Sequence, residues 1–346
     1  MIKKEKKLAI YMEGNLDSMF AKMGYGVMRY SKNPIVCVID SEFSGRMVDE
    51  VLNHQPFKIP IVTTVEDAHK MGAEVLVLGL APSGGKLPDS WLPAVETTLK
   101  MGMSLVNGLH DLLNERFAHL LDPNIPDQLI WDVRKPKTDY AIARARVAKL
   151  NNKRVLMVGT DMAVGKMTAG LEVYKWLKSK GKDADFLPTG QIGITVMGKG
   201  IPLDAIKVDQ ACGAVEHMVL EAKEKEIVFI EGQGSLLHPG STATLPLMRG
   251  SCPTHLILCH RAEMKTLRDC NEIRIPPLSQ VMKLNESVVH ACGAFPKPKT
   301  IGIALNTSKL TETEALKLID ELENETGLPV TDVVRFGAEK LGKTLL

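Results

Sequence analysis

The chain has 346 residues, of which 45% are hydrophobic and 24% are charged, so it is long enough to bury two domain cores of ordinary size. Its formal net charge of +2 comes from 43 basic and 41 acidic residues that are interleaved, which argues against nucleic acid or an anionic membrane as a partner. No apolar run reaches the length of a membrane helix, and the six cysteines form no C-x-x-C pair. We therefore expect a cytoplasmic protein with reduced thiols.

The first part of the chain alternates short apolar runs with helix-like segments, a rhythm that is typical of parallel α/β sheets. The apolar runs at 35–39, 59–62 and 75–80 predict buried strands. We therefore predict a Rossmann-like domain over residues 1–130. No G-x-G-x-x-G follows a strand in this domain, so a dinucleotide site is unsupported.

Two loops of this domain carry candidate substrate-binding residues. Ser83 and Gly84 lie in the loop APSGGK, which follows a predicted strand and precedes a helix-like stretch at 90–100. A turn without a ligand would also contain such glycines, so both interpretations stay open. His110 follows the apolar run 103–106 and is either an ordinary hydrogen-bonded histidine or a substrate contact.

Residues 122–137 are predicted to connect the two domains. The segment DPNIPDQLIWDVRKPK contains three prolines and few periodic apolar positions. A second α/β domain is expected from 138 to 346. The predicted fold class is therefore α/β, with a Rossmann-like sheet followed by a P-loop sheet.

The most informative motif of the chain is RVLMVGTDMAVGKMTAGLEVYKWLKSKG at residues 154–181. The apolar run 155–158 predicts a strand that is covered on both faces, and the later apolar residues recur at helical spacing. Between them lies a loop in which backbone amides at a helix start and the Lys166 ammonium can converge on an anion. We therefore expect phosphates to be bound by Gly159, Thr160, Gly165, Lys166, Met167 and Thr168.

This loop departs from the common pattern G-x-x-x-x-G-K-[ST] in two ways. Five residues rather than four separate Gly159 from Gly165, and Met167 stands where a hydroxyl group usually binds Mg²⁺. A thioether is a poor ligand for this hard cation, although Thr168 could still bond a phosphate oxygen. The loop is therefore expected to hold phosphates without the usual magnesium site, and we predict no protein-bound metal.

Further apolar runs at 185–187, 227–230, 255–259 and 301–305 predict the other strands of the second domain. Open α/β sheets bind ligands at the carboxyl ends of their strands, so the polar residues that follow these runs are candidate site residues. They are Thr189, Gln191, Glu231, Gln233, Ser235, Arg261 and Asn306.

Three residues are candidate catalytic groups. Glu231 ends a predicted strand, where it could hold a cation, accept a proton or simply remain solvated. Asp161 lies inside the phosphate loop and would repel a phosphate unless it faced a positive charge. His238 has a suitable ordinary pKa for a general base, but a structural histidine fits the position equally.

Six motifs, spread over nearly the whole chain, resemble a single family. In chain order they are GLAPSGGKLP, VNGLHDLL, IWDVRKP, VGTDMAVGKMT, PTGQIGI and EGQGSLLHP. They resemble the D-glutamate N-acetyltransferase-like family, formerly a domain of unknown function, which pairs a Rossmann-like domain with a P-loop domain. The chain has Ile192 where the family's motif TGQTGI has a threonine, and the segment after His260 also differs from the family pattern.

The resemblance implies an acyltransferase of D-amino-acid metabolism. Its reaction would move the acetyl group of acetyl-CoA to the amine of a small-molecule amino-acid substrate, D-glutamate in particular. Acetyl-CoA would be a cosubstrate whose phosphates lie on the loop, and one of the three candidate catalytic groups would take the proton of the substrate ammonium. The remaining expected contacts are adenine with Asn306, the oxyanion with backbone N–H groups or Gln191, and substrate carboxylates with Arg261 or Arg268.

Two alternative functions stay open. The pair GTD-x-x-x-G-K and EG-x-G-x-L is also similar to dethiobiotin synthetase, in which case Lys166, Thr168 and Glu231 would hold Mg-ATP for an ATP-dependent carboxylase or ligase. A non-catalytic nucleotide-binding regulator is the third alternative. Met167 argues against the ATP-dependent carboxylase or ligase, and the lack of a low-complexity tail argues against the non-catalytic regulator. In each case we expect a homo-oligomer, a dimer or higher.

Overall fold

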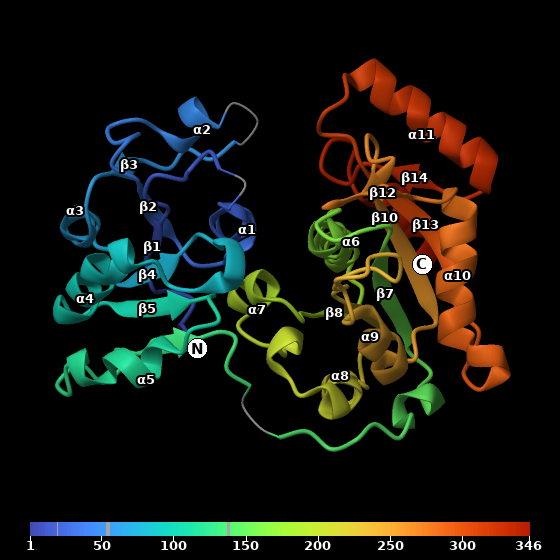
Figure 1. Cartoon of the computed structure of the whole chain (residues 1–346), viewed down its shortest axis with the longest axis horizontal. Coiled ribbons are helices and arrows are strands. Elements are labelled where there is room, and N and C mark those ends of the chain that lie inside the picture. The colour runs from blue at the N-terminus through green and yellow to red at the C-terminus, as the bar shows by residue number, and fades with distance from the viewer. Residues whose placement is uncertain (19, 53–55, 137–138) are drawn as a thin grey trace. The chain divides into compact units, whose positions relative to one another are not determined.

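The structure is a computed structural model, and it describes residues 1–18, 20–52, 56–136 and 139–346, with the side chain of Ser83 outside the described part. The chain forms two compact units (Figure 1). Each unit contains one six-stranded sheet in which all the paired strands are parallel. The predicted α/β class with two sheets is therefore confirmed. Within the described residues, no helix is both long enough and apolar enough to cross a membrane.

The N-terminal unit comprises residues 1–137 together with 191–205. Its strand order is β3-β2-β1-β4-β5-β6, which is the order of a doubly wound Rossmann sheet. The strands are β1 (Leu8–Tyr11), β2 (Ile35–Ile39), β3 (Ile61–Val62), β4 (Val75–Leu78), β5 (Ser104–Asn107) and β6 (Ile130–Asp132). The helices are α1 (Lys22–Tyr30), α2 (Val48–Val51), α3 (Val65–Lys70), α4 (Leu92–Lys100), α5 (Leu113–Phe117) and α7 (Gln191–Met197).

The segment 122–137 is more than a connection between domains, because it contains β6, which pairs with β5. The three prolines of the segment lie on either side of this short strand and do not interrupt its hydrogen bonds. Residues 191–205 add a helix to the N-terminal unit, although in the sequence they lie between two segments of the C-terminal unit. The expected boundary at 137–138 lies outside the described residues.

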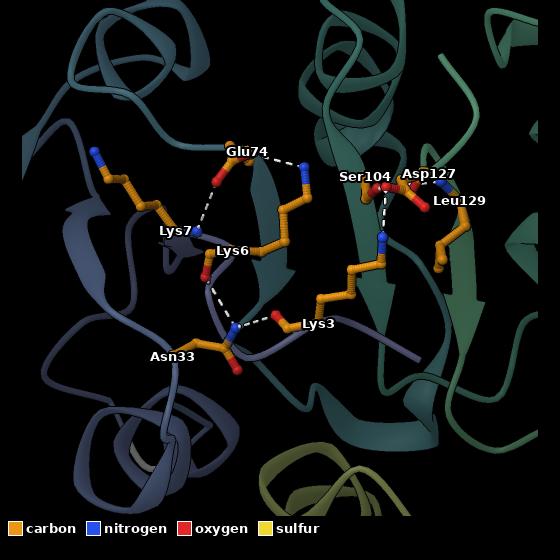
Figure 2. A network of polar contacts seen from close by, with 8 residues as sticks. All are labelled: Lys3, Lys6, Lys7, Asn33, Glu74, Ser104, Asp127 and Leu129. Atoms are coloured by element: carbon orange, nitrogen blue, oxygen red, sulfur yellow. Dashed lines mark hydrogen bonds and ion pairs between the residues drawn. The ribbon is translucent and has the colours of Figure 1, made fainter.

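The chain start is fastened to the N-terminal unit by a network of polar contacts (Figure 2). Glu74 accepts a hydrogen bond from the Lys6 ammonium at 2.7 Å and another from the Lys7 backbone amide at 3.1 Å. The Asn33 amide donates to the carbonyl groups of Lys3 and Lys6, and the Lys3 ammonium pairs with Asp127 at 2.8 Å. Exposed ion pairs contribute little individually, so the backbone contacts are the more important part of this network.

The C-terminal unit comprises residues 138–190 and 206–346, and its strand order is β14-β13-β10-β7-β9-β8. Strands β7 (Lys153–Gly159), β9 (Ile227–Ile230) and β10 (His255–Arg261) form the centre of the sheet and are almost fully buried, as expected of parallel strands covered on both faces. The other strands are β8 (Ala184–Leu187), β13 (Lys299–Asn306) and β14 (Val330–Thr331), with a separate hairpin of β11 (Thr266–Leu267) and β12 (Cys270–Arg274). The helices are α6 (Lys166–Ser179), α8 (Val208–Glu221), α9 (Thr244–Ser251), α10 (Leu278–His290), α11 (Glu312–Thr326) and α12 (Glu339–Gly342).

Helix α8 fixes the segment that leads into this unit. The buried carboxylate of Glu216 accepts hydrogen bonds from the Arg146 amide at 2.6 Å and from the Arg144 amide at 3.2 Å, and it pairs with the Arg146 guanidinium at 2.8 Å. A Cβ atom on Gly213 would lie 1.6 Å from the carbonyl oxygen of Ala141, so the segment lies directly on the helix backbone. This attachment holds the chain in place just before β7.

We expect Glu216→Gln to lower the free energy of unfolding by about 2 kcal/mol at neutral pH, because two backbone amides lose a charged acceptor. Burial raises the pKa of Glu216, but the bonds from Arg146 and Arg144 outweigh it and the pKa is lowered overall. The carboxylate therefore stabilises the fold above the ordinary glutamate pKa, and this contribution is lost as the pH falls through the lowered value. Urea unfolding, followed by far-ultraviolet circular dichroism, measures the difference.

The matched control is Glu221→Gln, which removes an exposed carboxylate of the same helix. A difference between wild type and Glu216→Gln that persists unchanged in acid would contradict the assigned role of the carboxylate.

Candidate functional site

The phosphate-loop motif of the C-terminal unit forms a strand, a loop and a helix, as its sequence predicts. β7 ends at Gly159, and the 14-residue helix α6 begins at Lys166. Gly165 precedes the helix with a φ of +104°, a conformation that favours glycine. The first backbone amides of a helix have no partner within it, and the helix dipole adds partial positive charge there. The loop is therefore suited to an anionic group, with Met167 and Thr168 in the first turn of the helix.

The Lys166 ammonium lies inside this loop. Its side chain is 7% exposed, and Nζ donates a hydrogen bond to the Asp161 carbonyl oxygen at 2.8 Å. A Cβ atom on Gly159 would lie 3.1 Å from this Nζ, so a side chain at that position would crowd the ammonium. Burial lowers the pKa of Lys166 to about 8. The ammonium is therefore poorly solvated, and a bound phosphate would supply the counter-charge.

The Asp161 carboxylate belongs to the framework of the loop. Its Oδ1 accepts a hydrogen bond from the Met162 amide at 2.6 Å, and its Oδ2 accepts one from the Arg268 amide. The side chain is fully buried. Because both carboxylate oxygens are used by backbone amides, Asp161 is poorly placed to take a proton from a substrate. Its contacts instead join the loop to the β11–β12 hairpin.

Glu231 follows β9 and is the second buried carboxyl group of the site. Its Oε2 accepts hydrogen bonds from the amides of Thr189 at 2.8 Å and Gly190 at 3.1 Å, while the Thr189 hydroxyl donates to the Glu231 carbonyl oxygen. Oε1 lies 3.4 Å from the side-chain nitrogen of Gln233. The residue is 3% exposed, and burial raises its pKa to about 7. Near neutral pH this group can therefore both accept and release a proton.

The backbone after β9 brings Glu231 close to the phosphate loop. A Cβ atom on Gly232 would lie 1.7 Å from the Met157 carbonyl oxygen and 2.8 Å from Cδ of Lys166. Only a glycine allows this approach, which lays the end of β9 on β7 and on the lysine side chain. The opposite charges of Glu231 and Lys166 act on each other's pKa values, although burial is the larger influence on both. The two groups form one buried pair at the carboxyl edge of the sheet.

Ser235 and His238 hold the loop after β9 in place. The Ser235 hydroxyl donates to the Gly159 carbonyl oxygen at 3.0 Å. Nδ1 of His238 accepts a hydrogen bond from the Gly240 amide at 3.0 Å, so its Nε2 carries the hydrogen and donates to the Arg268 carbonyl oxygen at 2.9 Å. Both ring nitrogens are thus engaged, which favours the structural interpretation of this histidine.

Arg261 and Asn306 were expected to follow strands, but they are the last residues of β10 and β13 and lie opposite each other in the sheet. Both strands extend beyond the apolar runs of the sequence, because the backbone pairing between β10 and β13 continues to Arg261 and Asn306. Nε of Arg261 lies 3.6 Å from Glu263, and Oδ1 of Asn306 accepts a hydrogen bond from the Ser308 amide at 3.1 Å. The asparagine therefore closes a local turn.

The remaining predicted residues belong to the N-terminal unit. Ser83 and Gly84 lie in a short 3₁₀ turn after β4, and Gln191 begins α7. The His110 amide donates to the Gly85 carbonyl oxygen at 2.7 Å, and Nε2 of His110 accepts a hydrogen bond from Arg134 at 3.0 Å. Ser83, Gly84 and His110 thus follow strands β4 and β5 of the first sheet, whereas Gln191 directly follows Gly190, whose amide bonds the Glu231 carboxylate.

His260 was not among the site residues predicted from the sequence, but the structure places it beside the loop. Its Nδ1 lies 2.9 Å from the Thr160 hydroxyl, and burial lowers its pKa to about 4. The ring is therefore neutral and serves as a hydrogen-bonding partner of the loop. Its position directly after an apolar run was the available signal, but a single histidine there is also common in ordinary strands.

Comparison with known proteins identifies relatives of both parts of the chain. Residues 41–136 match the family model described as the DUF1611_N Rossmann-like domain, and residues 141–342 match the one described as the DUF1611_C P-loop domain. Both models are described as domains of unknown function.

Two curated relatives carry the name D-glutamate N-acetyltransferase. The protein from Pseudoalteromonas sp. is 33% identical over 88% of this chain and 89% of its own length. The protein from Tritonibacter scottomollicae is 36% identical over 80% of this chain and 83% of its own length. Among solved structures, the crystal structure of a DUF1611 family protein from Anabaena variabilis ATCC 29413 is similar, with a TM-score of 0.94, 46% identity and 99% coverage of both chains.

Proposed function

Because the chain belongs to the DUF1611 family and is similar to two curated enzymes named D-glutamate N-acetyltransferase, we propose that it transfers the acetyl group of acetyl-CoA to the amine of D-glutamate. The structural observation that best supports this reaction is the Glu231 carboxyl group, whose raised pKa of about 7 suits a general base. It lies beside a phosphate-binding loop, as a reaction between an amine and a phosphorylated acyl donor requires.

Glu231 prepares the amine for attack. A substrate ammonium has no lone pair, so one proton must leave before its nitrogen can attack the thioester carbonyl carbon. Oε2 of Glu231 is held by two backbone amides, which leaves Oε1, on the side of Gln233, as the atom that takes this proton. The tetrahedral intermediate then collapses and the C–S bond breaks. The nitrogen also loses its second proton as the amide forms, so that one of the two protons passes to the departing CoA thiolate and the other is released to water.

The phosphate loop holds the acyl donor in this proposal. The Lys166 ammonium and the first amides of α6 bind the pyrophosphate of acetyl-CoA, so that the thioester is presented near Glu231. Met167 occupies the position of the usual Mg²⁺-binding hydroxyl, which is no disadvantage for acetyl transfer because no phosphoryl group moves. The loop therefore suits a phosphorylated carrier that is bound and released intact.

The proposal predicts a bell-shaped dependence of kcat/KM for acetyl-CoA on pH. Glu231 must be a carboxylate to accept a proton, so the value should fall as the pH drops below about 7. Lys166 must be charged to bind phosphate, so the value should also fall as the pH rises above about 8. Thiol release from acetyl-CoA with D-glutamate measures this profile, since kcat/KM reports groups of the free enzyme. A profile without an acidic limb, or no thiol release at any pH, would contradict the proposal.

A further inference from the structure

The C-terminal unit contains a second feature, a cavity of about 860 Å³ beside the carboxyl end of β10. Two basic side chains, Lys265 and Arg274, and one acidic side chain, Glu325, lie on its wall. The apolar side chains of Met264, Ile275 and Pro276 form another part of it. Among the described residues, neither Lys265 nor Arg274 forms an ion pair with an acidic side chain. With Glu325 counted, the wall carries two positive charges and one negative charge, and the two basic groups remain available to an anionic ligand next to an apolar surface.

This cavity adjoins the phosphate loop. His260 lines it, and the same ring is bonded through Nδ1 to the hydroxyl of Thr160, the first residue after β7. The β11–β12 hairpin supplies further lining residues, and its turn is attached to the loop by the bond from the Arg268 amide to Asp161. A ligand whose phosphates lie on the loop could therefore extend into the cavity without crossing another element of the sheet.

The size and the charge of the cavity indicate which of the two reactants would bind in it. Pockets of roughly 300–1,000 Å³ accommodate ligands as large as drugs and cofactors, so the cavity is far larger than glutamate needs. Apolar side chains suit the face of an adenine ring, and Lys265 and Arg274 suit a phosphate dianion. Coenzyme A carries both groups at the end remote from its thioester, because its adenosine bears a 3′-phosphate.

We propose that this cavity binds the 3′-phosphoadenosine end of acetyl-CoA, with Lys265 and Arg274 on the 3′-phosphate. The proposal rests on the proposed function, and it adds the residues that distinguish coenzyme A from other ligands with a pyrophosphate. In this arrangement Lys166 holds the pyrophosphate, the apolar wall of the cavity packs on the adenine ring, and Lys265 and Arg274 contribute the affinity for the 3′-phosphate.

The test compares CoA with 3′-dephospho-CoA by calorimetry, using the full chain and the variant Lys265→Ala/Arg274→Ala. Both side chains are exposed, so their removal should leave the fold intact. Wild type should bind CoA about tenfold or more tightly than dephospho-CoA, since two charge-assisted contacts to one phosphate are lost with it. The variant should bind both ligands equally, with the affinity of wild type for dephospho-CoA. The control Lys283→Ala/Lys317→Ala removes two exposed lysines that do not line the cavity.

Three results would overturn the proposal. The first is that wild type binds CoA and dephospho-CoA with equal affinity, and the second is that the variant keeps the wild-type preference for CoA. The variant could instead raise KM for D-glutamate while CoA affinity stays unchanged, which would assign the cavity to the amino acid. If wild type binds CoA in any of these cases, the proposed function survives without this site. If wild type binds neither ligand, the proposed function itself fails.

Discussion

Glu231→Gln is expected to lower kcat for acetyl transfer by about 10²- to 10⁴-fold, the range that a positioned general base contributes. Glutamine keeps the size of the side chain, and its amide oxygen can still accept hydrogen bonds from the Thr189 and Gly190 amides. It cannot take a proton from the substrate ammonium. The remaining activity should also lack the acidic limb of the pH profile, because the group with a pKa of about 7 is gone.

The affinity for CoA should change little in this variant, which separates a catalytic defect from a binding defect. The matched control is Glu226→Gln, which alters an exposed carboxyl group just before the same strand and should leave kcat unchanged. A Glu231→Gln enzyme with the wild-type kcat and acidic limb would show that another group takes the proton.

Lys166→Ala is expected to weaken acetyl-CoA binding by about 100-fold or more, beyond the range of an ordinary titration, because a charge-assisted contact to phosphate is lost in a buried position. The same change removes a poorly solvated charge from the loop, so the fold should remain stable. Isothermal titration calorimetry with acetyl-CoA measures the loss, and thermal unfolding checks that the protein is folded.

Lys178→Ala provides the comparison, since this lysine is exposed in the last turn of the same helix and should not affect binding. Unchanged affinity in a folded Lys166→Ala protein would end the assignment of the loop to the acyl donor.

Most inner strands of both sheets could be predicted from the sequence, because strands buried on both faces are continuous apolar runs. The exception is β1 at the centre of the first sheet, which was not among the predicted runs although its four residues are buried. The apolar runs at 35–39 and 227–230 coincide with β2 and β9. Short edge elements carry too few residues for such a signal, which explains why β14 was missed. β6 was not predicted for a related reason, since it has three residues and lies in a segment rich in proline. It forms a strand because it pairs with β5.

The parts of the candidate site that are built from neighbouring residues in the chain could be predicted from the sequence. The strand, loop and helix around Lys166 follow from the spacing of glycines and apolar residues, and Glu231 follows from its place at a strand end. The contacts that divide roles among the carboxylates come from distant segments. Only the fold shows that the Arg268 amide, 107 positions further along the chain, donates a hydrogen bond to the Asp161 carboxylate. The fold also shows that Oε1 of Glu231 lies beside the Gln233 side chain. The cavity beside His260 likewise depends on a hairpin without a sequence signature.

Two parallel reactions test the central claim most directly. One contains the protein, acetyl-CoA and D-glutamate, and the other contains the protein, Mg-ATP and D-glutamate. The proposed function predicts that the first reaction forms free thiol and N-acetylated D-glutamate in equal amounts. It predicts that the second reaction forms no ADP. ADP formation from ATP without thiol release from acetyl-CoA would contradict it and would favour an ATP-dependent ligase.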